Sequence, residues 1–289
     1  KLNTSNPKVE DFLAGENGIA AKYLKRGISG YRLDVADELP EKFLERLRKT
    51  VKGEDPEAVI IGEVWENAAD KCAYGRRRKY FQGKQLDGVM NYPLKDGIIS
   101  FINKGDSNKL WDVVCDIYSS YPTQASEALM NILGTHDTER IMTVLAAERE
   151  IPKDGDELVH FLLNNSEYEI GKIKLKCASV LQYTLPGVPS VFYGDEAGVS
   201  GGRDPFCRKT YPWGREDKEI LSHYRKLGRI RRSEKLLCHG DLDIICHKNG
   251  VFAFTRSGEE GSITVAVNSG TECSLMPLPE KAKIIYDMR

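Results

Sequence analysis

Short apolar runs alternate with amphipathic segments over residues 1–236. The apolar runs predict strands at Ile28–Val35, Ala58–Ile61, Asp87–Met90, Leu129–Leu133 and Val188–Tyr193. Apolar spacings of three and four predict helices at 40–51, 98–102, 110–118, 168–184 and 218–235. Such alternation is typical of a parallel sheet with helices on both faces.

The pattern changes near residue 237. Three short alternating runs follow, at 242–245, 251–255 and 262–267, and Asn249-Gly250 between the first two is a strong hairpin signal. We therefore predict two domains, an α/β domain over 1–236 and a small antiparallel β domain over 237–289.

Five parallel strands do not decide the topology of the α/β domain. A closed (β/α) barrel has eight strands and spans about 250 residues. The strand count alone leaves open a five-stranded open sheet and an eight-stranded barrel represented by five of its strands.

Composition excludes some classes of partner. The chain is 40% hydrophobic and 29% charged, with a formal net charge of -1. A neutral chain gives no reason to expect a nucleic acid partner, and no apolar stretch approaches the roughly 20 residues of a membrane span. We expect neither partner.

The Cys and His residues have no metal-like spacing, and we expect no metal or other cofactor. An odd count of seven irregularly spaced Cys fits reduced, mostly buried thiols and favours a cytoplasmic protein, although the start at Lys1 leaves secretion open. We expect four of the five His on the surface: His160, His223, His239 and His247.

Ionisable residues stand where three of the predicted strands end. Arg32 and Asp34 end the first, Glu63 follows the second, and His136-Asp137 follow the fourth. Because the carboxyl ends of parallel strands share one rim, we expect these side chains to gather there. Carboxylates on one rim suit the cleavage of glycosidic bonds.

Each feature also has a structural interpretation. Arg32 and Asp34 alone could be a structural ion pair, and Glu63 a surface carboxylate. Asp137 could cap a helix over 138–148. Trp65 and Trp213 are by default core or interface aromatics, and the basic run 76–79 fits a solvated helix face.

Taken together, the motifs resemble the α-amylase superfamily of retaining glycoside hydrolases. Arg32–Ala36, Gly62–Trp65 and His136-Asp137 are similar to its fourth-, fifth- and seventh-strand motifs. Further similarities lie at Lys1–Asn3, Val89–Pro93, Gly187–Glu196 and Asp204–Arg208. Of these, Lys1–Asn3 and Val89–Pro93 resemble the branch of neopullulanases, cyclomaltodextrinases and amylopullulanases.

The resemblance implies a (β/α)8 TIM barrel represented by strands four to eight only, followed by a small antiparallel β-sandwich domain. The family's third-strand motif has no counterpart in this sequence. By this resemblance the chain is the C-terminal part of a longer enzyme. We expect it to be inactive alone, or to be completed by an N-terminal segment; a homodimer is a further option.

The resemblance also implies roles for the rim residues. Asp34 would be the nucleophile, with Arg32 keeping it ionised and oriented. Glu63 would be the general acid and then the base, so it must hold a proton before the first step. Asp137 and His136 would bind hydroxyls of the reacting sugar.

Three more residues would bind substrate. Trp65 would stack on the acceptor sugar, and Asp204 and Arg208 would hydrogen-bond the donor side. The implied activity is hydrolysis of α-1,4 bonds, with α-1,6 bonds as an option, in maltodextrin, pullulan or cyclodextrin. Transglycosylation on the same scaffold and a non-catalytic glucan-binding fragment are the alternatives.

Overall fold

The computed structural model describes residues 2–152, 161–270 and 282–288. Within them the chain forms two compact units. The first contains Lys1–Pro93 and Cys115–Met130, and the second contains Leu94–Val114 and Asn131–Arg289. The predicted domain division at residues 236 and 237 remains a prediction. Lys1, His160 and Cys273 lie outside the described residues.

A parallel sheet forms the centre of the first unit. Its strands are β1 (Gly30–Leu33), β2 (Val59–Gly62) and β5 (Gly88–Val89), in the order β1-β2-β5. In the register, Arg32 is paired with Ile61 and Leu33 with Gly62. Both strands therefore end at the same edge, where Asp34 and Glu63 follow them.

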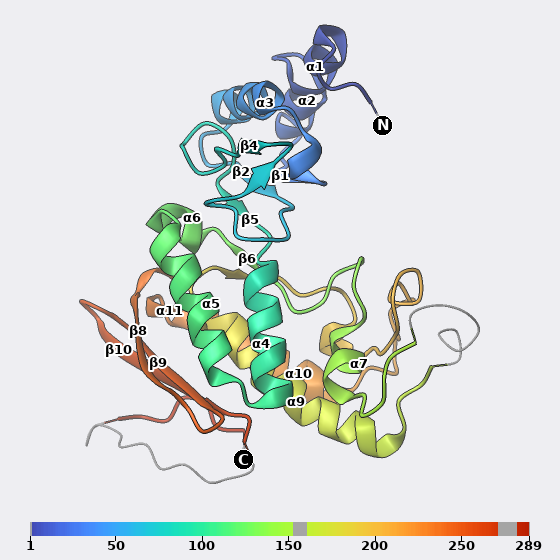
Figure 1. Cartoon of the computed structure of the whole chain (residues 1–289), viewed down its shortest axis with the longest axis vertical. Coiled ribbons are helices and arrows are strands. Elements are labelled where there is room, and N and C mark those ends of the chain that lie inside the picture. The colour runs from blue at the N-terminus through green and yellow to red at the C-terminus, as the bar shows by residue number, and fades with distance from the viewer. Residues whose placement is uncertain (1, 153–160, 271–281, 289) are drawn as a thin grey trace. The chain divides into compact units, whose positions relative to one another are not determined.

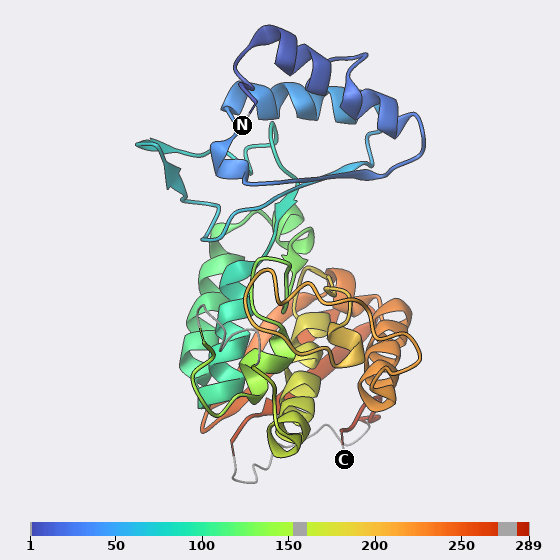
Figure 2. The same cartoon turned by 90° about the vertical axis from the view of Figure 1, so that its right-hand side faces the viewer.

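Helices α1 (Pro7–Ala14), α2 (Ile19–Leu24) and α3 (Glu41–Glu54) lie together in this unit (Figures 1 and 2). In α3, Phe43, Leu47 and Val51 are buried at a spacing of four, as the sequence pattern predicts. The sequence reading did not predict α1 or α2. The unit also holds α6 (Thr123–Glu127) and the 3-10 turn η1 (Ala36–Glu38).

The basic run at 76–79 is not a helix face, which corrects that interpretation. Strand β4 (Arg76–Arg77) pairs with β3 (Cys72–Ala73), and both arginines are exposed. Arg78 is buried instead, and it donates hydrogen bonds to the carbonyls of Ala36 and Leu39. A buried guanidinium needs such acceptors, which a sequence pattern does not reveal.

Helices dominate the second unit. They are α7 (Ile141–Ala146), α9 (Asn165–Thr184), α10 (Lys218–Ser233), α11 (Leu236–His239) and the turn η2 (Asp195–Ala197). A capping box fixes the start of α9, because Asn164 and Glu167 each accept the other's backbone N–H.

Helices α4 (Tyr92–Lys104) and α5 (Ser107–Ser120) have residues in both units. The short strands β6 (Met130–Asn131) and β7 (Val188–Pro189) pair with each other, and Ser190 donates its backbone N–H to the carbonyl of Asn131. These strands are shorter than the apolar runs that predicted them.

The C-terminal part of the described chain is an antiparallel sheet, as predicted (Figure 1). It contains β8 (Asp241–Lys248), β9 (Val251–Gly258) and β10 (Gly261–Asn268), with β9 central. Asn249 and Gly250 both have positive φ, 53° and 72°, which a type I′ hairpin requires.

A buried arginine attaches this sheet to the helices of the second unit. Arg256 of β9 is only 1% exposed. Its guanidinium donates to the carbonyls of Thr184, Leu237 and Gly240, at the C-terminal ends of α9 and α11. Helix ends leave such carbonyls without intrahelical partners, so the arginine satisfies them and fixes the sheet position within the unit.

Among the described residues, none of the helices is long and apolar enough to cross a membrane.

Candidate functional site

In the first unit, one guanidinium holds two carboxylates. Arg32 is on β1, and its Nη1 lies 2.6 Å from Asp34 Oδ1 while its Nη2 lies 3.1 Å from Glu63 Oε2. The two acids differ in environment, since the side chain of Asp34 is 75% exposed and that of Glu63 is 5% exposed. One carboxylate is thus open to solvent and the other is enclosed beside the same positive charge.

Glu63 is held in one orientation by three donors. Besides Arg32, the backbone N–H of Val35 donates to Oε2 at 2.8 Å and the indole Nε1 of Trp65 donates to Oε1 at 3.1 Å. Val35 has φ 44°, a conformation that a β-branched residue rarely adopts. Such strain concentrates at functional sites, and here it directs the Val35 N–H at Glu63.

An aromatic pair stands beside this cluster. The Trp65 ring stacks on the Tyr92 ring with centroids 4.2 Å apart and planes 12° from parallel. Tyr92 is buried while Trp65 is 48% exposed, so Trp65 is neither a core residue nor fully solvated. Tyr92 was not among the predicted site residues.

In the second unit, Asp137 lies between His136 and Arg208. His136 Nε2 is 3.1 Å from Asp137 Oδ2, and Arg208 Nη2 is 3.5 Å from Asp137 Oδ1. Arg208 also pairs with Asp204 at 2.6 Å and donates to the His136 carbonyl at 3.1 Å. The structure therefore brings together all four predicted residues of this unit.

A buried ion pair missed by the sequence reading supports this second cluster. Arg140 and Asp195 are 0% and 2% exposed, and Arg140 Nη1 lies 3.1 Å from Asp195 Oδ1. Burial raises the pKa of Asp195, and the Arg140 guanidinium opposes that rise. Arg140 also donates to the carbonyls of Cys207 and Tyr193, so it fixes the loop that carries Arg208.

In the sequence, Arg140 lies only three residues after Asp137, and this proximity could have identified it as a candidate site residue. The signal for Asp195 is its place at the end of the Gly187–Glu196 motif. The sequence does not predict that these two residues pair, because spacing along the chain does not show that two distant segments meet.

Three of the structural interpretations are corrected. Asp137 does not cap a helix, since the N-cap of α7 is Arg140. Trp213 is not a core aromatic, because 81% of its surface is exposed. His223 is buried rather than on the surface, and it lies between Ser179 and Tyr286.

In addition, only Cys177 and Cys207 of the six described thiols are buried, and all six are free.

Groups of His, Cys, Asp and Glu that could hold a metal ion do not occur in the described ranges. The side chains of both clusters are instead paired with cations and hydrogen-bond donors.

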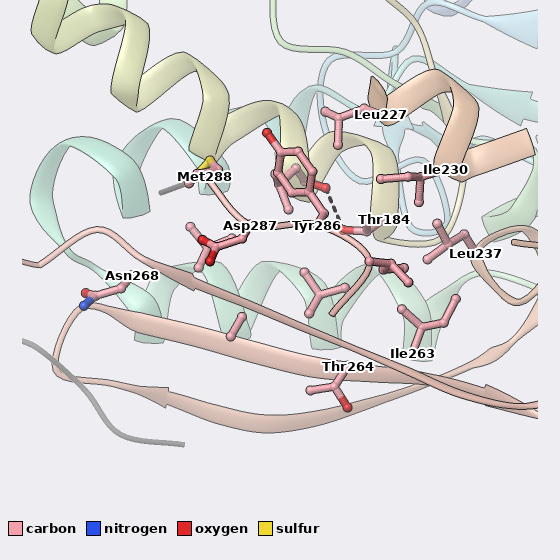
Figure 3. A pocket seen from close by; sticks show the side chains of 15 residues that line it. Thr184, Leu227, Ile230, Leu237, Ile263, Thr264, Asn268, Tyr286, Asp287 and Met288 are labelled. Carbon is pink, nitrogen blue, oxygen red and sulfur yellow. Dashed lines mark hydrogen bonds between the residues drawn. The ribbon is translucent and has the colours of Figure 1, made fainter. Parts of the chain in front are cut away.

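A cavity of about 400 Å³ in the second unit contains none of the predicted site residues (Figure 3). It lies between α9, α10 and β10, and its walls are mainly aliphatic, as Leu227, Ile230 and Ile263 illustrate. Asp287 is its one carboxylate among the described residues. Such walls lack the convergent polar groups of a sugar site, so the two clusters remain the candidates.

Comparison with known proteins agrees with the motifs and the fold. Residues 1–229 match the family "Alpha amylase, catalytic domain". The cyclomaltodextrinase of Geobacillus thermopakistaniensis is 31% identical over 290 residues, which cover 98% of this chain and 43% of that protein. A solved cyclomaltodextrinase structure superposes with a TM-score of 0.76 at 32% identity, over 93% of this chain and 41% of the other.

A second solved structure holds a sugar. It is the cyclic α-maltosyl-(1→6)-maltose hydrolase of Arthrobacter globiformis in complex with that saccharide. It has a TM-score of 0.75 and 26% identity, over 92% of this chain and 53% of the other.

The proteins to which the chain is similar imply the fold class of TIM-barrel glycoside hydrolases. The chain belongs to the α-amylase catalytic domain family. It spans about 43% of the length of the cyclomaltodextrinase that it matches.

Proposed function

We propose that the chain carries the catalytic residues of a retaining α-glucan hydrolase that acts on maltodextrin, pullulan or cyclodextrin. The observation that carries this proposal is the single Arg32 guanidinium that holds Asp34 and Glu63. A retaining glycosidase needs two neighbouring carboxyl groups with different roles, one a nucleophile and the other an acid and base.

In the first step, an Asp34 oxygen attacks the anomeric carbon while Glu63 gives its proton to the glycosidic oxygen. The bond between the anomeric carbon and that oxygen breaks, and a covalent glycosyl ester forms on Asp34. The exposure of Asp34 and its contact with Arg32 suit an ionised nucleophile that a sugar can reach.

In the second step, Glu63 takes a proton from water, and the resulting hydroxide attacks the anomeric carbon and releases Asp34. The fixed orientation of Glu63 favours this dual role, because the same oxygen must give and take a proton at one place.

Asp137 and His136 would hydrogen-bond hydroxyls of the reacting sugar, and Asp204 and Arg208 those of the donor side. The exposed face of Trp65 would stack on the acceptor sugar. These assignments rest on the family and on the pairing of Asp137 with His136 and Arg208.

We further propose that β1, β2, β5, β6 and β7 correspond to strands four to eight of a (β/α)8 barrel, and that the C-terminal sheet belongs to a β-sandwich. Turnover would then need additional polypeptide, either an N-terminal segment or a second subunit. Comparison of the 289-residue chain with a longer protein that carries it tests this point, and equal turnover by the two would contradict it.

The test of the function is Asp34→Asn in such a longer protein, with reducing-sugar release from the three substrates as the measurement. We expect loss of release, because an amide is a poor nucleophile. The matched control is Asp96→Asn, which changes an exposed aspartate paired with its neighbour Lys95. Wild-type release by Asp34→Asn would contradict the proposal.

The covalent intermediate can also be attacked by a sugar hydroxyl, which gives transglycosylation. Chromatography of products at high substrate concentration distinguishes the two reactions. Oligosaccharides longer than the substrate would identify transfer, and shorter products alone would identify hydrolysis.

A further inference from the structure

Trp213 is an exposed aromatic side chain that neither cluster uses. It is 81% exposed, the largest exposed fraction among the large hydrophobic side chains of the described residues. Tryptophan is buried to a large extent in most proteins, so a fully presented indole is informative. Water solvates an exposed aromatic ring poorly, so a ligand that covers the ring gains binding free energy.

The backbone presents this ring at the tip of a tight turn. The N–H of Arg215 donates to the Pro212 carbonyl at 2.8 Å, with Trp213 and Gly214 as the central residues. Gly214 has φ 74°, which the third position of a type II turn requires. Glu216 accepts the Gly214 N–H at 3.1 Å and fixes the turn further.

The Tyr211 ring packs against the indole of Trp213. The two ring centroids are 4.5 Å apart with planes tilted by 51°. Burial and the nearby Glu196 carboxylate raise the pKa of Tyr211, and Glu196 also accepts the Gly194 N–H at 2.8 Å. The two rings therefore form a preorganised surface, the Tyr211–Trp213 platform, which a ligand could cover at small entropic cost.

The platform is continuous with the loop that holds Arg208. Tyr193 donates its hydroxyl to the Lys209 carbonyl at 2.8 Å, and Arg140 binds the Cys207 carbonyl at 2.6 Å. The segment between Arg208 and the platform is therefore anchored to buried parts of the second unit. A glucan that extends beyond the donor-side residues could follow this segment.

We propose that the Tyr211–Trp213 platform is a binding site for α-1,4-glucan chains, additional to the residues assigned to the reaction. A glucose ring has an apolar C–H face, which would lie on the indole, and a rim of hydroxyls. Exposed polar neighbours, among them Lys209, Thr210 and Arg215, would hydrogen-bond that rim. The choice of α-glucan as the ligand rests on the proposed function.

A protein partner fits this surface less well. Stable protein interfaces need a contiguous buried core with few charges. The platform has only one fully exposed ring, and exposed basic side chains flank it on both sides. A second copy of this chain is therefore an outcome of the test rather than the proposal.

The test is native gel electrophoresis of the 289-residue chain in gels that contain soluble starch, with Asp34→Asn in every protein so that no starch is hydrolysed. Trp213→Ala is compared with Trp213→Phe, which keeps a ring, and with Phe12→Ala, which removes another exposed aromatic side chain. A β-linked cellulose derivative replaces starch as the ligand control.

We expect starch to retard the parent chain, Phe12→Ala and Trp213→Phe. Trp213→Ala should weaken the apparent affinity about tenfold, as for loss of a small buried apolar face. Equal retardation of Trp213→Ala and the parent chain would overturn the proposal, and so would the absence of retardation by starch. If the parent chain sediments as a dimer and Trp213→Ala as a monomer, a second copy of the chain covers the platform, which would also overturn the proposal. Failure of the proposed function would appear separately, as absence of sugar release by a longer protein.

Discussion

At the scale of single residues, the structure gives two carboxylates of the same cluster unequal surroundings. Asp34 is open and touches one donor group, while Glu63 is enclosed and touches three. The sequence predicted both residues because each ends an apolar run. It could not predict the donors from Val35 and Trp65, which depend on a strained backbone and on a rotamer.

Glu63→Gln tests the assignment of the general acid. We expect kcat on maltotriose to fall about 10²- to 10⁴-fold, since an amide has no proton to transfer. A glycosyl fluoride, whose leaving group needs little protonation, should lose much less in its first step. Pre-steady-state release of the leaving group is the measurement. An equal loss on both substrates would contradict the assignment.

Arg140→Met tests the buried pair. It leaves Asp195 without its counter-charge in a site with almost no solvent, and such changes typically cost 3–5 kcal/mol, so we expect a loss of about that size in the free energy of unfolding. The double variant Arg140→Met/Asp195→Leu should recover part of the loss. Urea denaturation measures the free energy of unfolding of both variants, and a double variant that is no more stable than Arg140→Met would contradict the pairing.

At the scale of elements, sequence patterns identified long helices and the C-terminal hairpin strands well. Helix α3 buries Phe43, Leu47 and Val51 at a spacing of four, and strand β10 buries Val265 and Val267 on alternate positions. The pattern failed for α1 and α2, because both are short and most of their buried residues are alanine. It also overestimated β6 and β7, because apolar residues continue past the last paired residue of each strand.

The hairpin at Asn249-Gly250 gives a prediction at this scale. Gly250→Ala should destabilise the chain by about 1–2 kcal/mol, since φ is 72° and a new Cβ would lie 2.9 Å from the Gly270 nitrogen. Gly53→Ala in α3 is the control, because its Cβ would meet nothing within 4 Å. It should stabilise by up to about 1 kcal/mol. Thermal unfolding of both variants is the measurement, and losses of equal size would contradict it.

At the scale of the whole molecule, we expect stability to depend on pH through His223. Its Nε2 lies 2.7 Å from Ser179 Oγ, and its Nδ1 contacts the Tyr286 hydroxyl. Burial lowers the pKa of His223 to about 4, and Lys176 and Lys226 add to that effect while Glu219 opposes it. In the unfolded chain this histidine binds a proton near pH 6.5. The stabilisation that neutral His223 gives the folded chain is therefore complete above that pH and is lost as the pH falls toward 4.

We therefore expect the native chain to lose about 2 kcal/mol more stability between pH 7.5 and pH 5 than His223→Gln does. Urea denaturation at the two pH values measures this difference. His239→Gln, which changes an exposed histidine, is the control and should behave as the native chain. If the stability of His223→Gln falls with pH as much as that of the native chain, His223 is excluded as the cause.

The proposed function depends most on a covalent bond between Asp34 and the sugar. The most direct measurement is mass spectrometry of a longer protein that carries this chain, with Glu63→Gln, after reaction with a fluorinated glycosyl fluoride that slows hydrolysis of the ester. We expect one added glycosyl group on the peptide that contains Asp34. A glycosyl group on another carboxylate, or a product of inverted anomeric configuration, would contradict it.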